Sequence, residues 1–308
     1  MSALTITRLL LVPLLLSISG PGCSFKRIAV NQLGNALAAG GMTFASDDDP
    51  ELIRDAVPFS LKLMESLLAE SPKHKGLLLA SCKGFTQYAY AFVQLDADEV
   101  ESSDLAKATE RRRRAQKLYL RARNYGLRGL EANHRGIESV LRANPRDAVT
   151  KLKRNDVALM YWTAAAWGAA ISVSKDNPDL VADLPIVEAL MDRALELDER
   201  FEDGAIHVFL ITYEMARPSE KANAEANARR RFDRAIELTK SQLASPFVSL
   251  AENVCVAKQD KAEFQSLLNQ ALAIDVDARP EWRLVNLVMQ RRARWLLVRT
   301  DDLFLPPE

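Results

Sequence analysis

Glycine, cysteine and histidine are scarce in this chain, and their scarcity narrows the chemistry it can perform. Among 308 residues there are 12 glycines, three cysteines and three histidines. The histidines, His74, His134 and His207, do not form a zinc-binding pair such as H-E-x-x-H, and no C-x-x-C occurs. There is also no G-x-S-x-G elbow and no phosphate-binding glycine loop. We therefore expect no catalytic residue, metal or cofactor, and an enzyme would need a constellation assembled from distant residues.

Charge of one sign is not in excess either. Lys and Arg together number 41, and so do Asp and Glu, so the formal net charge gives no support for nucleic-acid binding. Arg111–Arg114 is the sharpest local run, but consecutive residues point all round a helix. The run therefore favours a solvated helix surface, with anionic lipid headgroups or an acidic partner as the alternative. Asp47–Asp49 is interpreted as a capping cluster before Pro50 rather than a cation site.

The apolar run near the N-terminus is too short to be a permanent membrane span. Leu9–Ile18 has about half of the ~20 residues that a spanning helix needs. It follows Arg8 and precedes Cys23, which is the order of a bacterial lipoprotein signal peptide. An ordinary secretory signal is the alternative, because Gly20–Pro21 fits a lipoprotein site poorly. Both interpretations place the mature chain outside the cytoplasm, and the first predicts lipid on Cys23.

The remainder of the chain has the periodicity of helices. Apolar residues recur every three or four positions, and no alternating strand pattern is convincing. Asp49–Pro50–Glu51 has the cap, proline and acid of a helix start, and Asn177–Pro178–Asp179 repeats it. We predict helices at about 50–71, 75–95, 104–131, 134–143, 155–174, 202–216, 219–243, 246–258, 261–274 and 280–299.

Several helix ends are similar to one another. Ala194–Asp198, Ala235–Thr239 and Ala271–Asp275 each place a small residue before aliphatic residues, and their starts are 41 and 36 residues apart. The standard tetratricopeptide period is about 34 residues. We predict an all-α, right-handed solenoid of degenerate tetratricopeptide-like hairpins with 11–13 helices, and the alternative is a non-repetitive bundle. The predicted organisation is a signal peptide at 1–22, a lead-in at 23–45 and one helical domain at 46–305.

Thiols and aromatic residues are the remaining candidates for function. Cys82 and Cys255 lie in apolar helical runs far apart in the sequence, which favours buried free thiols over a disulfide. The aromatic groups are interpreted first as hairpin packing, but Tyr and Trp on a concave helical surface would also suit an apolar ligand. The candidate cavity residues are Phe85, Tyr88, Tyr90, Trp162 and Trp167.

Four further blocks of sequence are informative when they are taken together. They are Phe44–Leu52 with the following Arg54–Asp55–Ala56 and Pro58, then Glu65–Pro72, Gly84–Phe92 and Tyr125–Leu130. These blocks resemble the T component family of TRAP-transporter-associated lipoproteins, often called TatT. They occur in order and with compatible spacing, and the resemblance covers the chain from Ser24 to about Leu303.

The resemblance implies more than the residues alone predict. It implies an all-helical periplasmic lipoprotein that forms homotrimers, each protomer with a cavity or pore. It also implies association with the substrate-binding P component of a tripartite ATP-independent periplasmic (TRAP) transporter that handles an apolar solute, and Ser24 is compatible with the outer membrane. We therefore expect a non-enzymatic accessory protein that docks the P component and shelters or passes the solute. The alternative is a general envelope scaffold that binds other proteins.

Overall fold

Capping side chains followed by proline begin several helices. Oδ1 of Asp49 accepts hydrogen bonds from the backbone N–H groups of Glu51 and Leu52, each at 3.0 Å, and Pro50 occupies the first helical turn. Asn177 caps the helix that begins at Pro178 in the same way. These contacts satisfy amide groups that have no partner within the helix, and they confirm the two starts predicted from sequence.

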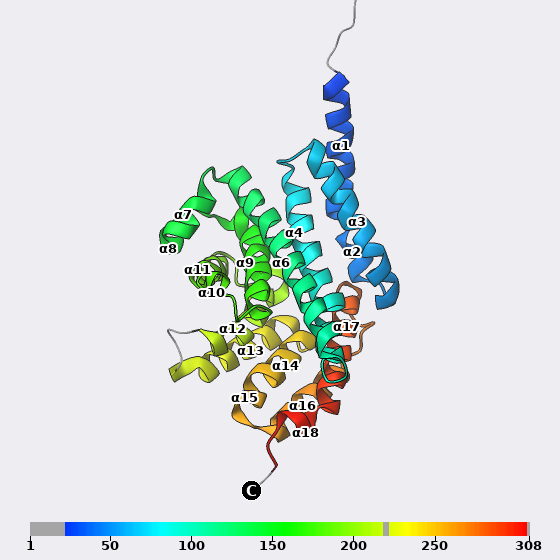
Figure 1. Ribbon diagram of the computed structural model, residues 1–308, viewed down its shortest axis with the longest axis vertical. Coiled ribbons are helices and arrows are strands. Elements are labelled where there is room, and N and C mark those ends of the chain that lie inside the picture. The colour runs from blue at the N-terminus through cyan, green and yellow to red at the C-terminus, as the bar shows by residue number, and fades with distance from the viewer. Residues whose placement is uncertain (1–21, 218–221, 307–308) are drawn as a thin grey trace, which may run out of the picture.

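The computed structural model describes residues 22–217 and 222–306, and every regular element within these residues is helical (Figure 1). The all-α prediction is therefore confirmed. The α-helices are α1 (Gly22–Ala39), α2 (Gly41–Ala45), α3 (Pro50–Glu70), α4 (Lys75–Ala89), α5 (Leu95–Val100), α6 (Leu105–Asn133), α7 (Ile137–Ala143), α8 (Pro145–Val149), α9 (Val157–Ser172), α10 (Pro178–Val181), α11 (Leu184–Leu197), α12 (Ala205–Ala216), α13 (Ala224–Thr239), α14 (Ala244–Leu250), α15 (Val256–Lys258), α16 (Lys261–Leu272), α17 (Arg283–Val298) and α18 (Thr300–Leu303). Two π-helical turns, Tyr90–Gln94 and Ala251–Cys255, join α4 to α5 and α14 to α15.

The segment expected as a lead-in holds two helices. The helix α1 has no acidic residue in its first turn and no basic residue in its last turn, so the usual signals of helix ends are missing there. Val30 and Leu37 on α1 pack against the buried group of Leu77 and Leu78 on α4. Residues 1–21, which hold most of the predicted signal peptide, lie outside the described residues, and so does the side chain of Cys23.

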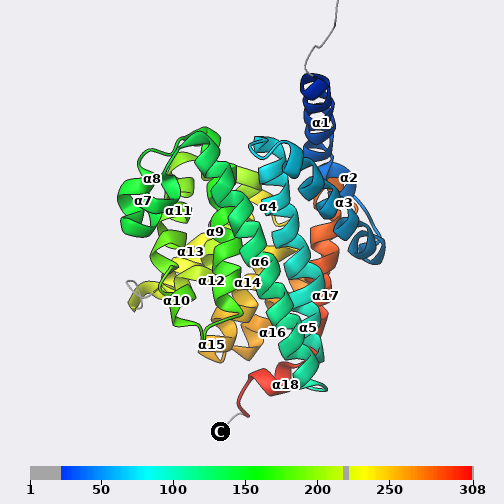
Figure 2. The ribbon, with the colours of Figure 1, turned by 45° about the horizontal axis from the view of Figure 1, so that its top comes forward.

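Helices that are near in the sequence pack beside one another. The helix α6 contacts both α4 and α9, and further contacts join α9 to α11, α12 to α13, and α14 to α16. Figure 2 shows α4, α6 and α9 side by side. The apolar core follows the chain as four adjoining groups of buried residues. Stacked helical hairpins bury their apolar side chains against hairpins that are adjacent in the sequence, as is seen here. The right-handed solenoid itself stays a prediction.

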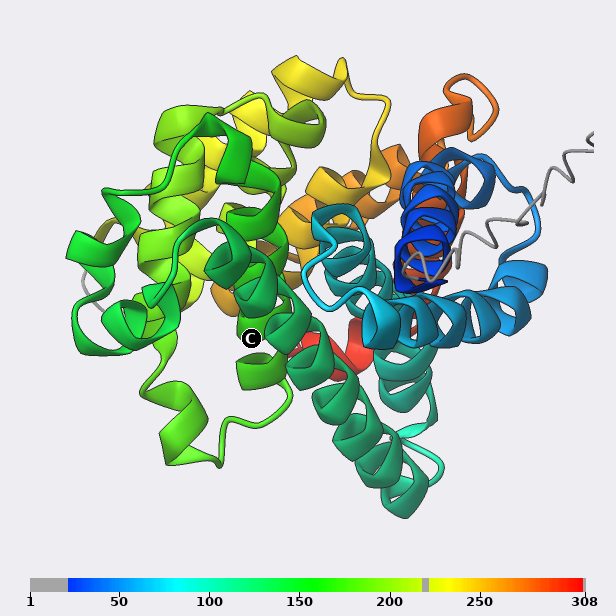
Figure 3. The same ribbon diagram turned by 90° about the horizontal axis from the view of Figure 1, so that it is seen from above.

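The C-terminal part of the chain returns to the N-terminal part. The helix α17 contacts α2 and α3, and Arg283 donates a hydrogen bond of 2.8 Å to the carbonyl oxygen of Ser46. Seen from above in Figure 3, the orange segment that leads into α17 lies beside the blue N-terminal helices. The helix α1 projects from one end of the molecule, and the chain ends at the other (Figure 1).

Candidate functional site

The first π-helical turn lies next to three of the aromatic residues selected from the sequence. Such wide turns are uncommon and occur often at functional sites. Buried Tyr119 on α6 anchors the turn, because its hydroxyl donates a hydrogen bond of 2.6 Å to Oε1 of Gln94. Tyr88 precedes the turn and Phe92 lies within it, with their ring centroids 5.7 Å apart.

A pocket of about 280 Å³ opens beside this turn, with side chains from α3, α4, α5 and α6 around it. The rings of Tyr88 and Phe92 form its apolar part, and the guanidinium groups of Arg54, Arg111 and Arg114 form its charged part. The guanidinium carbon of Arg54 lies 5.1 Å from the centroid of Phe92, and that of Arg114 lies 5.9 Å from the centroid of Tyr88. Each ring therefore supports a cation at the pocket wall.

Asp96 is the main counter-charge at this pocket, and several arginines share it. Its carboxylate accepts two hydrogen bonds from Arg54, at 2.5 and 3.2 Å, and one of 2.8 Å from Arg291. Burial opposes ionisation of Asp96, but these hydrogen bonds outweigh it and hold its pKa below the usual range. Arg111 donates to the backbone carbonyl of Asp96 at 3.0 Å, and its guanidinium is 3.8 Å from the carboxylate. Asp55 is a second carboxylate on the pocket wall, so the three guanidinium groups of Arg54, Arg111 and Arg114 exceed the lining carboxylates by one charge, which an anionic group could neutralise.

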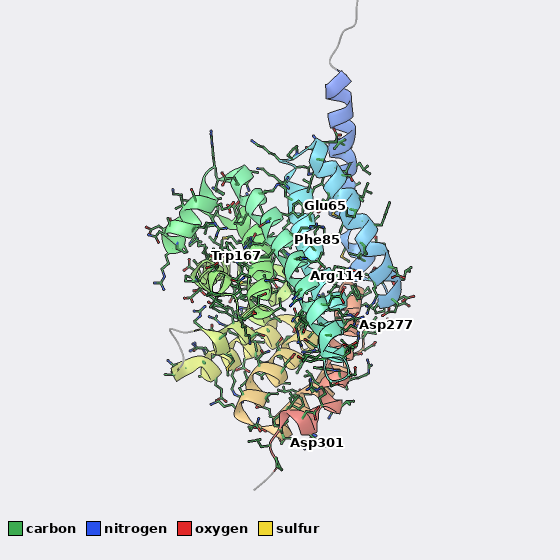
Figure 4. All side chains as sticks on the ribbon, in the orientation of Figure 1. Glu65, Phe85, Arg114, Trp167, Asp277 and Asp301 are labelled. Carbon is green, nitrogen blue, oxygen red and sulfur yellow. The ribbon has the colours of Figure 1, made fainter. Side chains whose placement is uncertain are left out.

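Phe85 and Tyr90 flank the pocket but do not line it. Phe85 stacks on Tyr125 with the ring centroids 5.9 Å apart, and the guanidinium of Arg121 lies over it at 5.4 Å. Figure 4 shows Glu65, Phe85 and Arg114 in the part of the molecule formed by α3, α4 and α6. Tyr90 turns the other way, with its hydroxyl 3.8 Å from Sδ of Met289, and burial raises its pKa to about 12.

The two tryptophans lie in a different part of the fold, on α9. Trp167 is fully buried, and its Nε1–H donates a hydrogen bond of 3.0 Å to Asp183. Nε1–H of Trp162 donates to Glu202 at 3.3 Å, and its ring packs edge-on against Tyr161 at 5.0 Å. Both indoles thus have hydrogen-bond partners, and the guanidinium groups of Arg123 and Arg142 lie over the ring of Trp167. The structure brings Phe85 and Tyr88 together but not the tryptophans, and their role in a ligand cavity stays a prediction.

A larger pocket, of about 490 Å³, lies where α11 ends, and sequence reasoning missed it. His207 on α12 lines it and is only 3% exposed, and neither ring nitrogen has a hydrogen-bond partner among the described residues. Burial, reinforced by the nearby charge of Arg231, lowers the pKa of His207 to about 4. A single histidine without a motif carries no signal in the sequence, so only the fold could reveal this environment.

The thiols have no arrangement suited to catalysis. Cys82 and Cys255 are both free and buried, which confirms the sequence interpretation. Burial raises the pKa of each thiol to about 12, so neither is a reactive thiolate near neutral pH.

Across the described ranges, the side chains form no group of three or more His, Cys, Asp or Glu residues that could hold a metal ion. No helix within those ranges has the length and apolar character of a membrane span.

Most of this chain matches a known protein family. Residues 46–304 match the family model described as TRAP transporter T-component. An uncharacterized protein of Treponema pallidum (strain Nichols) is 28% identical to this chain over 302 residues, which cover 92% of this chain and 94% of that protein. The family match includes the helices that build the Tyr88 pocket as well as the C-terminal helices that close on them. The chain therefore belongs to the TRAP transporter T-component family, whose members are accessory components of TRAP transport systems.

Proposed function

We propose that this protein is a non-enzymatic, lipid-anchored periplasmic lipoprotein that docks the substrate-binding P component of a TRAP transporter. The family match over 46–304 carries the proposal, because it spans nearly the whole described helical region. A homotrimer is the assembly that we expect.

The docking role can be tested with purified proteins. The mature chain, with Cys23 replaced by Ser to keep it in solution, would be immobilised and exposed to the P component of the same transport system. We expect saturable binding that survives competition by serum albumin. A P component that fails to bind at concentrations well above those in the periplasm would contradict the docking role.

Sheltering of an apolar solute is the second part of the proposal, and Tyr88 and Phe92 at the pocket wall support it. A specific observation favours the scaffold alternative, since Phe85 and Trp167 are fully packed and both tryptophan N–H groups have partners. Native mass spectrometry and solvent extraction of protein purified from its own cells separate the two. A stoichiometric apolar molecule supports sheltering, whereas an empty protein that still binds the P component supports the scaffold.

The lipid anchor requires its own measurement. The projecting helix α1 follows the predicted cleavage site, so a lipid on Cys23 would extend from the end of the molecule opposite the C-terminus (Figure 1). We expect the membrane-extracted protein to begin at Cys23 and to carry a diacylglyceryl mass. A mature N-terminus with an unmodified Cys23 thiol would contradict the anchor but would leave the family assignment unchanged.

A further inference from the structure

The charge of this protein is unevenly distributed, and α6 is its most basic element. Its 29 residues include nine Lys or Arg residues and only two acids, Glu110 and Glu131. The helix thus has a formal charge of +7, whereas the whole chain has none, so the remainder of the chain is acidic to the same extent. Such segregation produces a local positive potential that the net charge of the protein conceals.

Six of these cations occupy one face of α6. Lys107, Arg114, Arg121 and Arg128 follow one another at intervals of seven, which is close to two helical turns. Arg113 and Lys117 fall in the same sector, which spans roughly 120° of the helix circumference. All six side chains are exposed, while the opposite side of α6 is buried against α4 and α9. We call these six residues the α6 basic face. Glu110 lies within it, and Glu131, 18 residues after Arg113, continues the same sector at the C-terminal end of α6.

The basic face is poorly neutralised by its own protein. Within the described part of the chain, Arg121 is the one member of the basic face that forms an ion pair with a carboxylate. This ion pair is a long contact of 3.6 Å with Glu65. Elsewhere the arginines are well paired, as in the two-point contact of Arg229 with Glu263 at 2.6 and 2.7 Å. Like charges four residues apart destabilise a helix, so a bound anion would relieve repulsion among Arg113, Lys117 and Arg121.

Aromatic rings hold three of the guanidinium groups in place. The guanidinium carbon of Arg114 lies over Tyr88, that of Arg121 over Phe85 at 5.4 Å, and that of Arg128 over Tyr125 at 5.2 Å. These stacked side chains have fewer conformations to lose when they bind an anion. The three ring-supported cations span about 21 Å from position 114 to 128, and Lys107 extends the row to about 32 Å, at 1.5 Å per residue.

We propose that the α6 basic face docks an acidic segment of a partner protein, with one carboxylate entering the pocket between Arg111 and Arg114. Charge complementarity specifies the sign of the partner. The pocket of about 280 Å³ accommodates a protruding Asp or Glu side chain, which a flat bilayer surface does not offer. The face also lacks the large apolar side chains with which a basic amphipathic helix enters a membrane. The inference rests on the proposed function, in which that partner is the P component.

Charge-reversed variants test the proposal against a matched control. The variant Lys117→Glu/Arg121→Glu/Arg128→Glu removes half of the basic face and leaves the pocket arginines in place. The control Arg146→Glu/Lys151→Glu/Arg294→Glu makes the same change in net charge at exposed cations on other helices and loops. Circular dichroism checks that both fold. The probes are a fluorescein-labelled hexaglutamate peptide, the P component, and phosphatidylglycerol vesicles.

We expect the wild-type protein to bind the peptide and the P component, with affinity that falls between about 50 and about 300 mM NaCl. The α6 variant should lose at least about tenfold in affinity for both, and the control should bind like the wild type. Equal loss in the two variants would overturn the proposal. Binding to vesicles but not to the peptide would also overturn it, as would a change of oligomeric mass in the α6 variant alone, which would identify a second copy as the occupant.

The same measurements separate this inference from the proposed function. A P component that binds the wild type and the α6 variant equally well overturns the docking surface and leaves the docking role intact. A P component that binds neither, together with peptide binding that depends on α6, overturns the docking role while the acidic-segment surface stands.

Discussion

Nη1 of Arg292 lies 3.1 Å from Oδ2 of Asp98, and this ion pair joins α17 to α5. The same guanidinium also pairs with Glu252, which belongs to the second π-helical turn. Arg292 is only 6% exposed, so its charge depends on these two carboxylates for compensation. These ion pairs join three segments that are distant in the sequence. Asp98 follows the first π-helical turn and Glu252 lies in the second, so both turns lie near the contact of α17 with α5.

Replacement of Arg292 by Ala should therefore weaken the whole fold. The change leaves Glu252 without its partner and Asp98 with Arg112 as its remaining partner, and removal of one member of a buried pair costs about 3 kcal/mol of unfolding free energy. Urea unfolding followed by circular dichroism measures this. The control is Arg294→Ala, at an exposed neighbour, which should change stability by less than about 0.5 kcal/mol. Equal effects of the two substitutions would show that the pairing of Arg292 contributes little.

Gly126 should be intolerant of a methyl group because two helices approach closely there. A Cβ atom at this position would lie 2.1 Å from Oγ1 of Thr163 on α9 and 3.0 Å from Sγ of Cys82 on α4. Gly126→Ala should destabilise by about 1–3 kcal/mol despite the better helix propensity of alanine. Gly41 serves as the tolerant comparison, because a Cβ atom added there would meet no atom within 4 Å beyond its own helical turn.

The close approach at Gly126 also predicts a rescue. Thr163→Ala removes the nearest atom, so the double variant with Gly126→Ala should recover part of the lost stability. Thermal unfolding of the two single variants and the double variant gives the coupling between the sites. Strict additivity of the two changes would contradict the predicted clash.

The buried thiols predict a simple chemical count. In a Cys23→Ser variant of the mature chain, Cys82 and Cys255 should not react with Ellman's reagent while the protein is folded, because burial raises both pKa values to about 12. Both should react fully in guanidinium chloride. A rapid reaction of either thiol in the native protein would show that its helix opens readily or that its environment is more polar than the structure indicates.

Local signals in the sequence predict most helices after residue 49. They predict neither α1 and α2, which lie in the segment expected as a lead-in, nor the contacts between distant helices. Asp49 and Asn177 predict helix starts because a cap and its amide partners are neighbours in the chain. The π-helical turn at Tyr90–Gln94 has no such local signal, and the helix predicted to end near 95 continues to Val100. The pairing of Arg292 with Asp98 joins distant segments, which no periodicity within a single helix can indicate.

The candidate site was predicted only in part for a similar reason. Tyr88 is one of the aromatic residues expected to suit an apolar ligand, and it does line a pocket. Two of the three arginines of that pocket, Arg111 and Arg114, belong to the run Arg111–Arg114, whose members do point in different directions. Arg112 faces Asp98 and Glu101, for example, whereas Arg114 lies over Tyr88. The basic face arises from the interval of seven that links Arg114 to cations outside the run, and its exposure depends on tertiary packing.

His207 should make the protein sensitive to mild acid. Its pKa is about 4 in the folded protein against 6.5 for an ordinary histidine, because burial and Arg231 disfavour its charged form while Glu199 only partly compensates. Between these two values the unfolded chain binds more protons than the folded protein. Stability therefore falls as pH decreases from about 6.5 to about 4, and His207 makes no such contribution above 6.5.

The variant His207→Gln isolates this contribution. Carboxylates such as Asp96 titrate in both proteins, so the difference in urea midpoint between wild type and variant removes their effect. We expect the difference to move in favour of the variant as pH falls from 7 to about 4.5, since only the wild type must keep an imidazole neutral. Imidazole NMR signals of the folded wild type should show one histidine that remains neutral below pH 5, and that signal should be missing from the variant. If the difference in urea midpoint between wild type and variant does not change across this pH range, then water or a bound ion stabilises the charged ring of His207. The pocket at the end of α11 would then be more polar than the two unpartnered ring nitrogens of His207 indicate.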